Sequence, residues 1–185
     1  MPGADGESSA PARAAANGHT LRGLRAAGRF LLQLPWLAAL PLPFLWMALI
    51  WSLSSHHVPL PVEGSPFWEL MSNLAHAPLY GLLGLFAATL LLRGGGEWPT
   101  FRPASVALVL AVVVAYGAID EWHQSHVPGR DASPLDIVTD LTGAALVLWI
   151  AAYLGKREAS EGGLWLRLFA GIVLCVGSAG LALAS

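Results

Sequence analysis

The sequence predicts an all-α fold, a polytopic transmembrane helical bundle with five spans. Of its 185 residues, 55% are hydrophobic and only 12% are charged. A soluble domain is about 25% charged, so this chain has too little polar surface to coat a soluble globule. Five segments also contain the roughly 20 mainly apolar residues that a helix needs to cross a bilayer.

Charge and cysteine content exclude several other classes of protein. The formal net charge is −2, which leaves no basic groove for a nucleic acid, so we expect no nucleic-acid partner. Cys175 is the single cysteine, which excludes an intramolecular disulfide and a thiolate metal site. The sequence indicates no cofactor.

The N-terminal segment, residues 1–30, is predicted to be a disordered and basic region on the cytoplasmic side. Residues 1–19 are rich in Ala, Gly, Pro and Ser and show no periodicity, which is typical of a disordered tail. From residue 20 to 31, leucines recur at helical spacing with arginines between them. This pattern predicts either a short helix lying on an anionic leaflet or a basic flank to the first span.

Five apolar segments are predicted to span the membrane: Leu34–Leu53, Met71–Leu92, Pro103–Trp122, Leu135–Leu154 and Leu164–Ala184. The first contains three prolines, which a membrane helix tolerates but which bend it. No A-x-A cleavage site follows this segment, so we expect it to remain as an anchor. Residues 34–154 form the predicted four-helix membrane domain, and residues 164–184 add a fifth helix.

The basic residues predict the orientation of the bundle in a cell membrane. With the N-terminus in the cytoplasm, nine of the ten Lys and Arg residues lie on the cytoplasmic side, and only Arg130 lies outside. The nine are Arg13, Arg22, Arg25, Arg29, Arg93, Arg102, Lys156, Arg157 and Arg167. Short cytoplasmic loops carry such an excess of positive charge. Five spans then place the C-terminus on the extracytoplasmic side.

Polar residues gather at the predicted extracytoplasmic end of three spans. His76 lies inside the second span, the third span ends in Asp120-Glu121-Trp-His123-Gln124, and the fourth opens with Asp136 and Asp140. Arg130 lies in the short loop between the third and fourth spans. Ionisable groups within a membrane cost roughly 2.5–3.5 kcal/mol each on insertion scales, so a chain keeps several only where they pair or form a site. Gly143 and Ala144 are small enough for another helix to approach closely.

Several of these residues also have simpler interpretations. His76 can be a neutral histidine that bridges two helices, and Asp136 can cap the start of its helix. Glu121 and Arg130 can form a plain salt bridge. The remaining residues outside the cluster are expected to be solvated loop histidines (His56, His57, His126), a headgroup-facing acid (Asp120) and packing tyrosines (Tyr80, Tyr116).

The motifs at this end resemble those of the VanZ-like membrane protein family. The family pattern of E-x-x-Q, P-x-R, D, and then D before a glycine matches Glu121 with Gln124, Pro128 with Arg130, Asp136, and Asp140 with Gly143. An earlier histidine followed by Y-x-x-L-G matches His76 and the segment 80–84, although Asn73 and Ser72 stand where the family has an acid. The resemblance covers about residues 40–155. It implies a membrane bundle and a link to resistance to the glycopeptide teicoplanin, without an established reaction.

Three functions remain open for this polar end. It can bind an anionic envelope lipid or a lipoglycopeptide, with ligand-binding residues His76, Glu121, His123, Gln124, Arg130, Asp136 and Asp140. Arg130 then grips a phosphate or carboxylate through two parallel hydrogen bonds. It can instead act on a lipid-linked envelope precursor by acid–base chemistry, with Glu121, Asp136, Asp140 and His76 as catalytic candidates. Lastly, it can be a structural polar network.

A metal site is a further alternative, with His76, Glu121 and Asp136 as its ligands. The spacing of these residues gives it no special support, and the preferred interpretation has no metal.

Overall fold

The computed structural model describes residues 18–56, 61–62, 64–93, 98–130 and 132–183. Within these ranges the fold is helical and contains no strand, which confirms the predicted all-α class. The helices are α2 (His19–Gln33), α3 (Trp36–Ala39), α4 (Pro41–Ser54), α5 (Pro66–Leu74), α6 (His76–Leu91), α7 (Pro103–Gln124), α8 (Asp136–Leu154) and α9 (Glu161–Ala182). Most of the predicted tail, residues 1–17, lies outside the described residues, as do His57 and Asp131.

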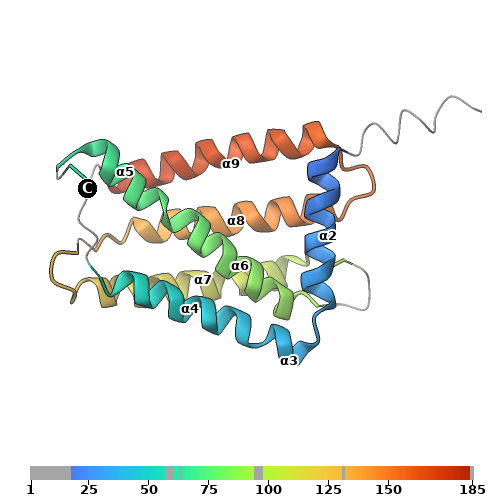
Figure 1. The fold of residues 1–185 in the computed structure, drawn as a ribbon, viewed down its shortest axis with the longest axis horizontal. Coiled ribbons are helices and arrows are strands. Elements are labelled where there is room, and N and C mark those ends of the chain that lie inside the picture. Colours follow the sequence, from blue (N-terminus) through green and yellow to red (C-terminus); the bar gives the residue numbers. More distant parts are fainter. Residues whose placement is uncertain (1–17, 57–60, 63, 94–97, 131, 184–185) are drawn as a thin grey trace, which may run out of the picture.

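Five helical segments of the described chain are long and apolar enough to cross a membrane: Trp36–Ser54, Pro66–Leu91, Pro103–Gln124, Asp136–Leu154 and Glu161–Ala182. They match the five predicted spans within a few residues at most ends. Figure 1 shows α4, α7, α8 and α9 running along the long axis of the molecule, while α5 and α6 cross them obliquely. Their outer faces carry exposed large hydrophobic side chains such as Leu37, Leu166 and Phe169. An apolar outer surface of this kind is suited to lipid rather than water.

Prolines divide the first two spans. The first is broken at Leu40 between α3 and α4, next to Pro41 and Pro43, which confirms the predicted bend. The second is broken at Ala75 between α5 and α6. Pro78 has no backbone N–H to donate to the carbonyl of Leu74, so the helical ladder is interrupted there. The break places His76 at the first residue of α6.

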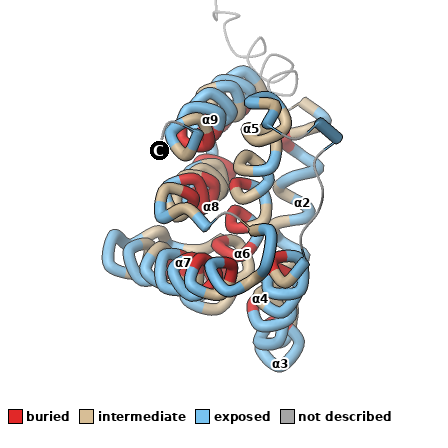
Figure 2. Tube along the Cα trace, turned by 90° about the vertical axis from the view of Figure 1, so that its left-hand side faces the viewer, coloured by how far each residue is buried: buried red, intermediate tan, exposed pale blue. Residues whose placement is uncertain are grey.

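The centre of the bundle is the contact between α6 and α8, with α7 against both. Figure 2 shows the buried stretches of these three helices facing one another. Small residues make the approach possible. A Cβ added to Gly143 would lie 2.1 Å from the backbone oxygen of Ala77, and one added to Gly84 would lie 3.0 Å from the Cβ of Ala144. The close approach predicted for Gly143 and Ala144 is therefore confirmed.

Helix α2 lies across one end of the bundle, at a steep angle to the spans (Figure 1). Arg25 donates its Nε to the carbonyl of Leu154 at 2.8 Å, at the end of α8. The Glu161 carboxylate, at the start of α9, accepts from the backbone N–H groups of Thr20 and Leu21 at 3.2 and 3.0 Å. These bonds hold α2 on the ends of two spans, so that it is not a straight extension of the first span.

Candidate functional site

The end of the bundle opposite α2 contains the predicted polar residues. His76 begins α6, Glu121 and Gln124 lie in the last turn of α7, and Asp136 and Asp140 lie in the first turns of α8. The four residues of α7 and α8 are buried, with Asp140 at 0% exposure. Because α6 and α8 begin where α7 ends, the antiparallel arrangement brings these side chains to one end.

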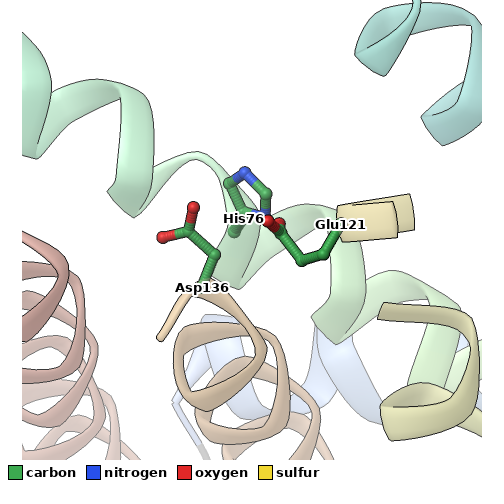
Figure 3. A group of neighbouring side chains, drawn as sticks. All are labelled: His76, Glu121 and Asp136. Atoms are coloured by element: carbon green, nitrogen blue, oxygen red, sulfur yellow. The ribbon is translucent and has the colours of Figure 1, made fainter. Parts of the chain in front are cut away.

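His76 is the centre of the first of two groups. Its Nδ1 lies 3.1 Å from the Oδ1 of Asp140, which is the single ion-pair contact within 4.0 Å among the described residues. Ligand atoms of His76, Glu121 and Asp136 all lie within 4.8 Å of one another. Figure 3 shows the His76 ring between the other two side chains, each of which projects from a different helix.

Asp120 is the centre of the second group, and its predicted position facing headgroups and water is wrong. The side chain is 1% exposed. Its Oδ2 accepts from the hydroxyl of Ser54 at 2.8 Å, the hydroxyl of Tyr80 at 3.1 Å and the amide of Gln124 at 2.9 Å. Asp120 occupies the face of α7 that packs on α4 and α6, where water is excluded, so three donors replace hydration.

Two aspects of this second group differ from the sequence-based interpretation. Tyr80 is not solely a packing residue, because its hydroxyl is a donor to Asp120. Gln124 was predicted to join His76 and the α8 acids, yet it binds Asp120 and lies 3.5 Å from Ser54 Oγ. Sequence reasoning missed Ser54. The available signal was a hydroxyl near the end of an apolar span, which is too common to be specific.

The two groups touch through Gly117 and Tyr80. A Cβ at Gly117 would lie 2.7 Å from Asp140 Oδ2 and 3.7 Å from the Tyr80 ring, so a glycine leaves room for the Asp140 carboxylate. The His76 and Tyr80 rings are parallel, with centroids 6.0 Å apart. The result is one continuous polar region shared by α4, α6, α7 and α8.

Arg130 does not form the salt bridge with Glu121 that the sequence left open. Its Nε donates to the carbonyl of Ser54 at 3.3 Å, and its Nη2 donates to the carbonyl of Leu53 at 3.2 Å. These carbonyls lie at the C-terminus of α4, where free acceptors attract a cation. Glu121 instead accepts from the backbone N–H of Ser133 at 2.8 Å. The partner of the Glu121 carboxylate is therefore a backbone N–H of the loop and not the expected Arg130.

The remaining histidines lie outside the cluster, and the helix cap predicted for Asp136 is not formed. His123 stacks on Trp51 with ring centroids 3.8 Å apart and bonds to Ser55, so it faces α4 rather than His76. His56 and His126 are exposed, as predicted. Asp136 makes no capping hydrogen bond to the start of α8. Its carboxylate is thus left for another partner.

Five buried oxygens in this region have no hydrogen-bond partner among the described residues: Asp120 Oδ1, Glu121 Oε1, Asp136 Oδ1, Thr139 Oγ1 and Asp140 Oδ2. Leaving a buried acceptor unpaired costs about 1–3 kcal/mol, and more for a charged group. A region with several such acceptors can hold protons or a cation, and can exchange protons through the His76–Asp140 pair.

An apolar groove of about 450 Å³ lies beside the polar region. Ala75 and Ala77, the neighbours of His76, line it, as does Gly143, three residues after Asp140. Across the groove lies α9, with Ile172 and Cys175. Ala75, Pro78 and Ile172 are exposed, so the groove opens at the outer surface of the bundle.

Fold and site together are those of a multi-pass membrane protein with a buried polar region at one end of its spans. Comparisons with protein-family models, with curated proteins and with solved structures gave no match.

Proposed function

We propose that this protein binds an amphiphilic envelope lipid at the polar end of its bundle. The headgroup lies against His76, Glu121 and Asp136, and an acyl or prenyl chain lies in the groove between α5, α6, α8 and α9. The observation that carries the proposal is the apolar groove, whose walls adjoin the buried polar cluster. Such a site matches the two chemistries of an amphiphile.

The motif resemblance to VanZ-like proteins supports an envelope lipid as the ligand class. It also extends the proposal to a lipoglycopeptide, whose lipid tail and polar body have the same two parts. Arg130 lies close enough to Asp136 for their charges to interact, and its guanidinium lies at the edge of the polar region. An anionic headgroup that enters this acidic region needs a cation between itself and the carboxylates, because like charges repel at short range.

Lipid co-purification tests this proposal. Ala75→Phe fills the groove and is expected to lower the lipid retained per chain by about tenfold, because each 1.4 kcal/mol of lost binding is a factor of ten. The control is Ala107→Phe, on an exposed position of α7 away from the groove. Mass spectrometry of lipids extracted from both purified variants gives the comparison. Equal retention of the same envelope lipid in both would contradict the groove as the binding site.

Orientation is a further part of the proposal: the N-terminus is cytoplasmic, and the polar end and the C-terminus are extracytoplasmic in the cell membrane. Topology reporters fused after Gly95 and after Gly162 are expected to report the cytoplasm, and one after Ser185 the opposite side. The reason is the positive-inside bias of the basic residues. A cytoplasmic signal from the Ser185 fusion would reverse the bundle or remove the last span from the membrane.

A catalytic role is the second candidate, favoured by the His76–Asp140 hydrogen bond. A carboxylate that holds an imidazole ring is the usual support of a histidine acid or base. Glu121 and Asp136 are within reach of the same ring. Turnover of a bound lipid precursor during incubation of the purified protein, seen as a mass change of the lipid, separates catalysis from binding.

A further inference from the structure

We propose that His76, Glu121 and Asp136 bind one divalent transition-metal ion, with Zn²⁺ and Mn²⁺ as the fitting ions. The inference goes beyond lipid binding and does not depend on it. It starts from the donor set: one imidazole nitrogen and two carboxylates, which suit these ions. Three separate helices supply the donors, so the site exists only in the folded bundle.

The distances between the donors are close to those of a metal site. The three ligand atoms lie within 4.8 Å of one another. Bonds of about 2.0–2.2 Å in a tetrahedral site place ligand atoms about 3.4 Å apart. Side-chain rotations can close this difference. Each donor atom must move by about 1 Å, which is less than the length of one carbon–carbon bond.

The burial of two unpartnered oxygens points to a ligand in this space. Glu121 is 7% exposed and Asp136 is 4% exposed, and Glu121 Oε1 and Asp136 Oδ1 have no partner among the described residues. Buried charges are normally paired or coordinate a metal. A dication beside two carboxylates gives a neutral site, which removes most of the cost of burying either charge alone.

Asp140 has the position of a supporting residue. Its Oδ1 bonds His76 Nδ1 at 3.1 Å, and Gly117 leaves space for its other oxygen. Metal-binding histidines are commonly held by such a carboxylate, which fixes the ring and raises its basicity. Asp140 therefore acts as a positioning residue for His76, and its replacement is expected to weaken metal binding without removing the site.

Three protein ligands leave an open coordination position, as in metal sites that bind or activate an exogenous group. A dication at this point cancels the charge of its two carboxylate ligands, and its open position can then accept a phosphate or carboxylate headgroup. The metal thus supplies the cation that an anionic lipid needs here. Because metal binding is measured without lipid, failure of one proposal leaves the other intact.

The experiment measures metal binding to the full chain, purified in detergent with a histidine-free tag and stripped by chelator. Calorimetric titration with Zn²⁺ and with Mn²⁺ is expected to give one ion per chain, and Mg²⁺ is expected to bind far more weakly. His76→Asn and Asp136→Asn are expected to lower Zn²⁺ affinity at least about 100-fold, and Asp140→Asn about 10- to 100-fold. The matched control, His126→Asn, changes an exposed histidine at the same end and is expected to bind like wild type.

A measurement on the wild-type protein alone tests the metal site even where the variants fail to fold. Bound Mn²⁺ is expected to show nitrogen hyperfine coupling in pulsed electron paramagnetic resonance, as an imidazole ligand requires. Three results overturn the proposal: no stoichiometric Zn²⁺ or Mn²⁺ binding by wild type, no nitrogen coupling, or equal affinity in His76→Asn and His126→Asn.

Discussion

Gly143→Ala is expected to destabilise the bundle by about 1–3 kcal/mol, the usual cost of forcing extra volume into a packed core. The added Cβ would lie 2.1 Å from the carbonyl oxygen of Ala77 and 2.7 Å from its Cα. These are backbone atoms of α6, so no side-chain rotation relieves the contact. The two helices must separate, and the shared packing around Leu83, Tyr80 and Ala144 opens with them.

The matched control is Gly177→Ala on α9, where an added Cβ meets nothing within 4 Å. Alanine is the better helix former by roughly 0.5–1 kcal/mol, so this variant is expected to be neutral or more stable. Unfolding of both variants in mixed micelles, followed by circular dichroism against SDS fraction, gives the difference. Equal stability of the two would mean that α6 and α8 do not meet at Gly143.

The second large effect is expected at Asp120. Asp120→Leu removes the acceptor of three hydrogen bonds, from Ser54, Tyr80 and Gln124. Each buried donor left without an acceptor costs about 1–3 kcal/mol. The sum is limited by water entry and side-chain rotation, so we expect a loss of several kcal/mol and a fall in membrane-inserted protein.

Asp120→Asn separates hydrogen bonding from charge. Its amide oxygen can take the place of Oδ2 and keep the three donors satisfied, while its NH₂ takes the place of Oδ1, which has no partner among the described residues. The expected loss is small compared with Asp120→Leu in the same micelle titration. Equal losses in both variants would show that the negative charge itself, not the acceptor, is required.

The sequence predicted the spans well because the length and apolar composition of a membrane-spanning helix can be read directly from its residues. It also predicted which end would be polar, since α6, α7 and α8 alternate in direction and each carries its ionisable residues at the matching terminus. His76 and Asp140, 64 positions apart, were placed together on this topological ground, and they form a hydrogen bond.

The partners within the polar end could not be predicted, because they depend on helix rotation and on backbone groups. Asp120 and Glu121 are adjacent, yet one faces α4 and Tyr80 while the other faces His76 and Ser133. One residue changes the direction of a helical side chain by about 100°. Arg130 was expected among carboxylates. Its partners are instead backbone carbonyls at the end of α4, and side-chain types do not predict which backbone groups a residue binds.

We expect helix α2 to set the depth at which the bundle lies in a bilayer. Its residue Leu21 is buried against Leu154 and Leu164, and Arg25 joins the helix to the carbonyl of Leu154. If α2 lies in the plane of one interface, this carbonyl marks the depth of that interface. From Leu154 to Asp136 the 19 residues of α8 rise about 28 Å, close to the roughly 30 Å hydrocarbon thickness. With α2 in one interface, we expect Asp136 at the opposite interface and Asp140 about 6 Å below it. A helix at one end of the bundle is therefore expected to keep the acidic end, about 28 Å away, level with the headgroups of the opposite leaflet.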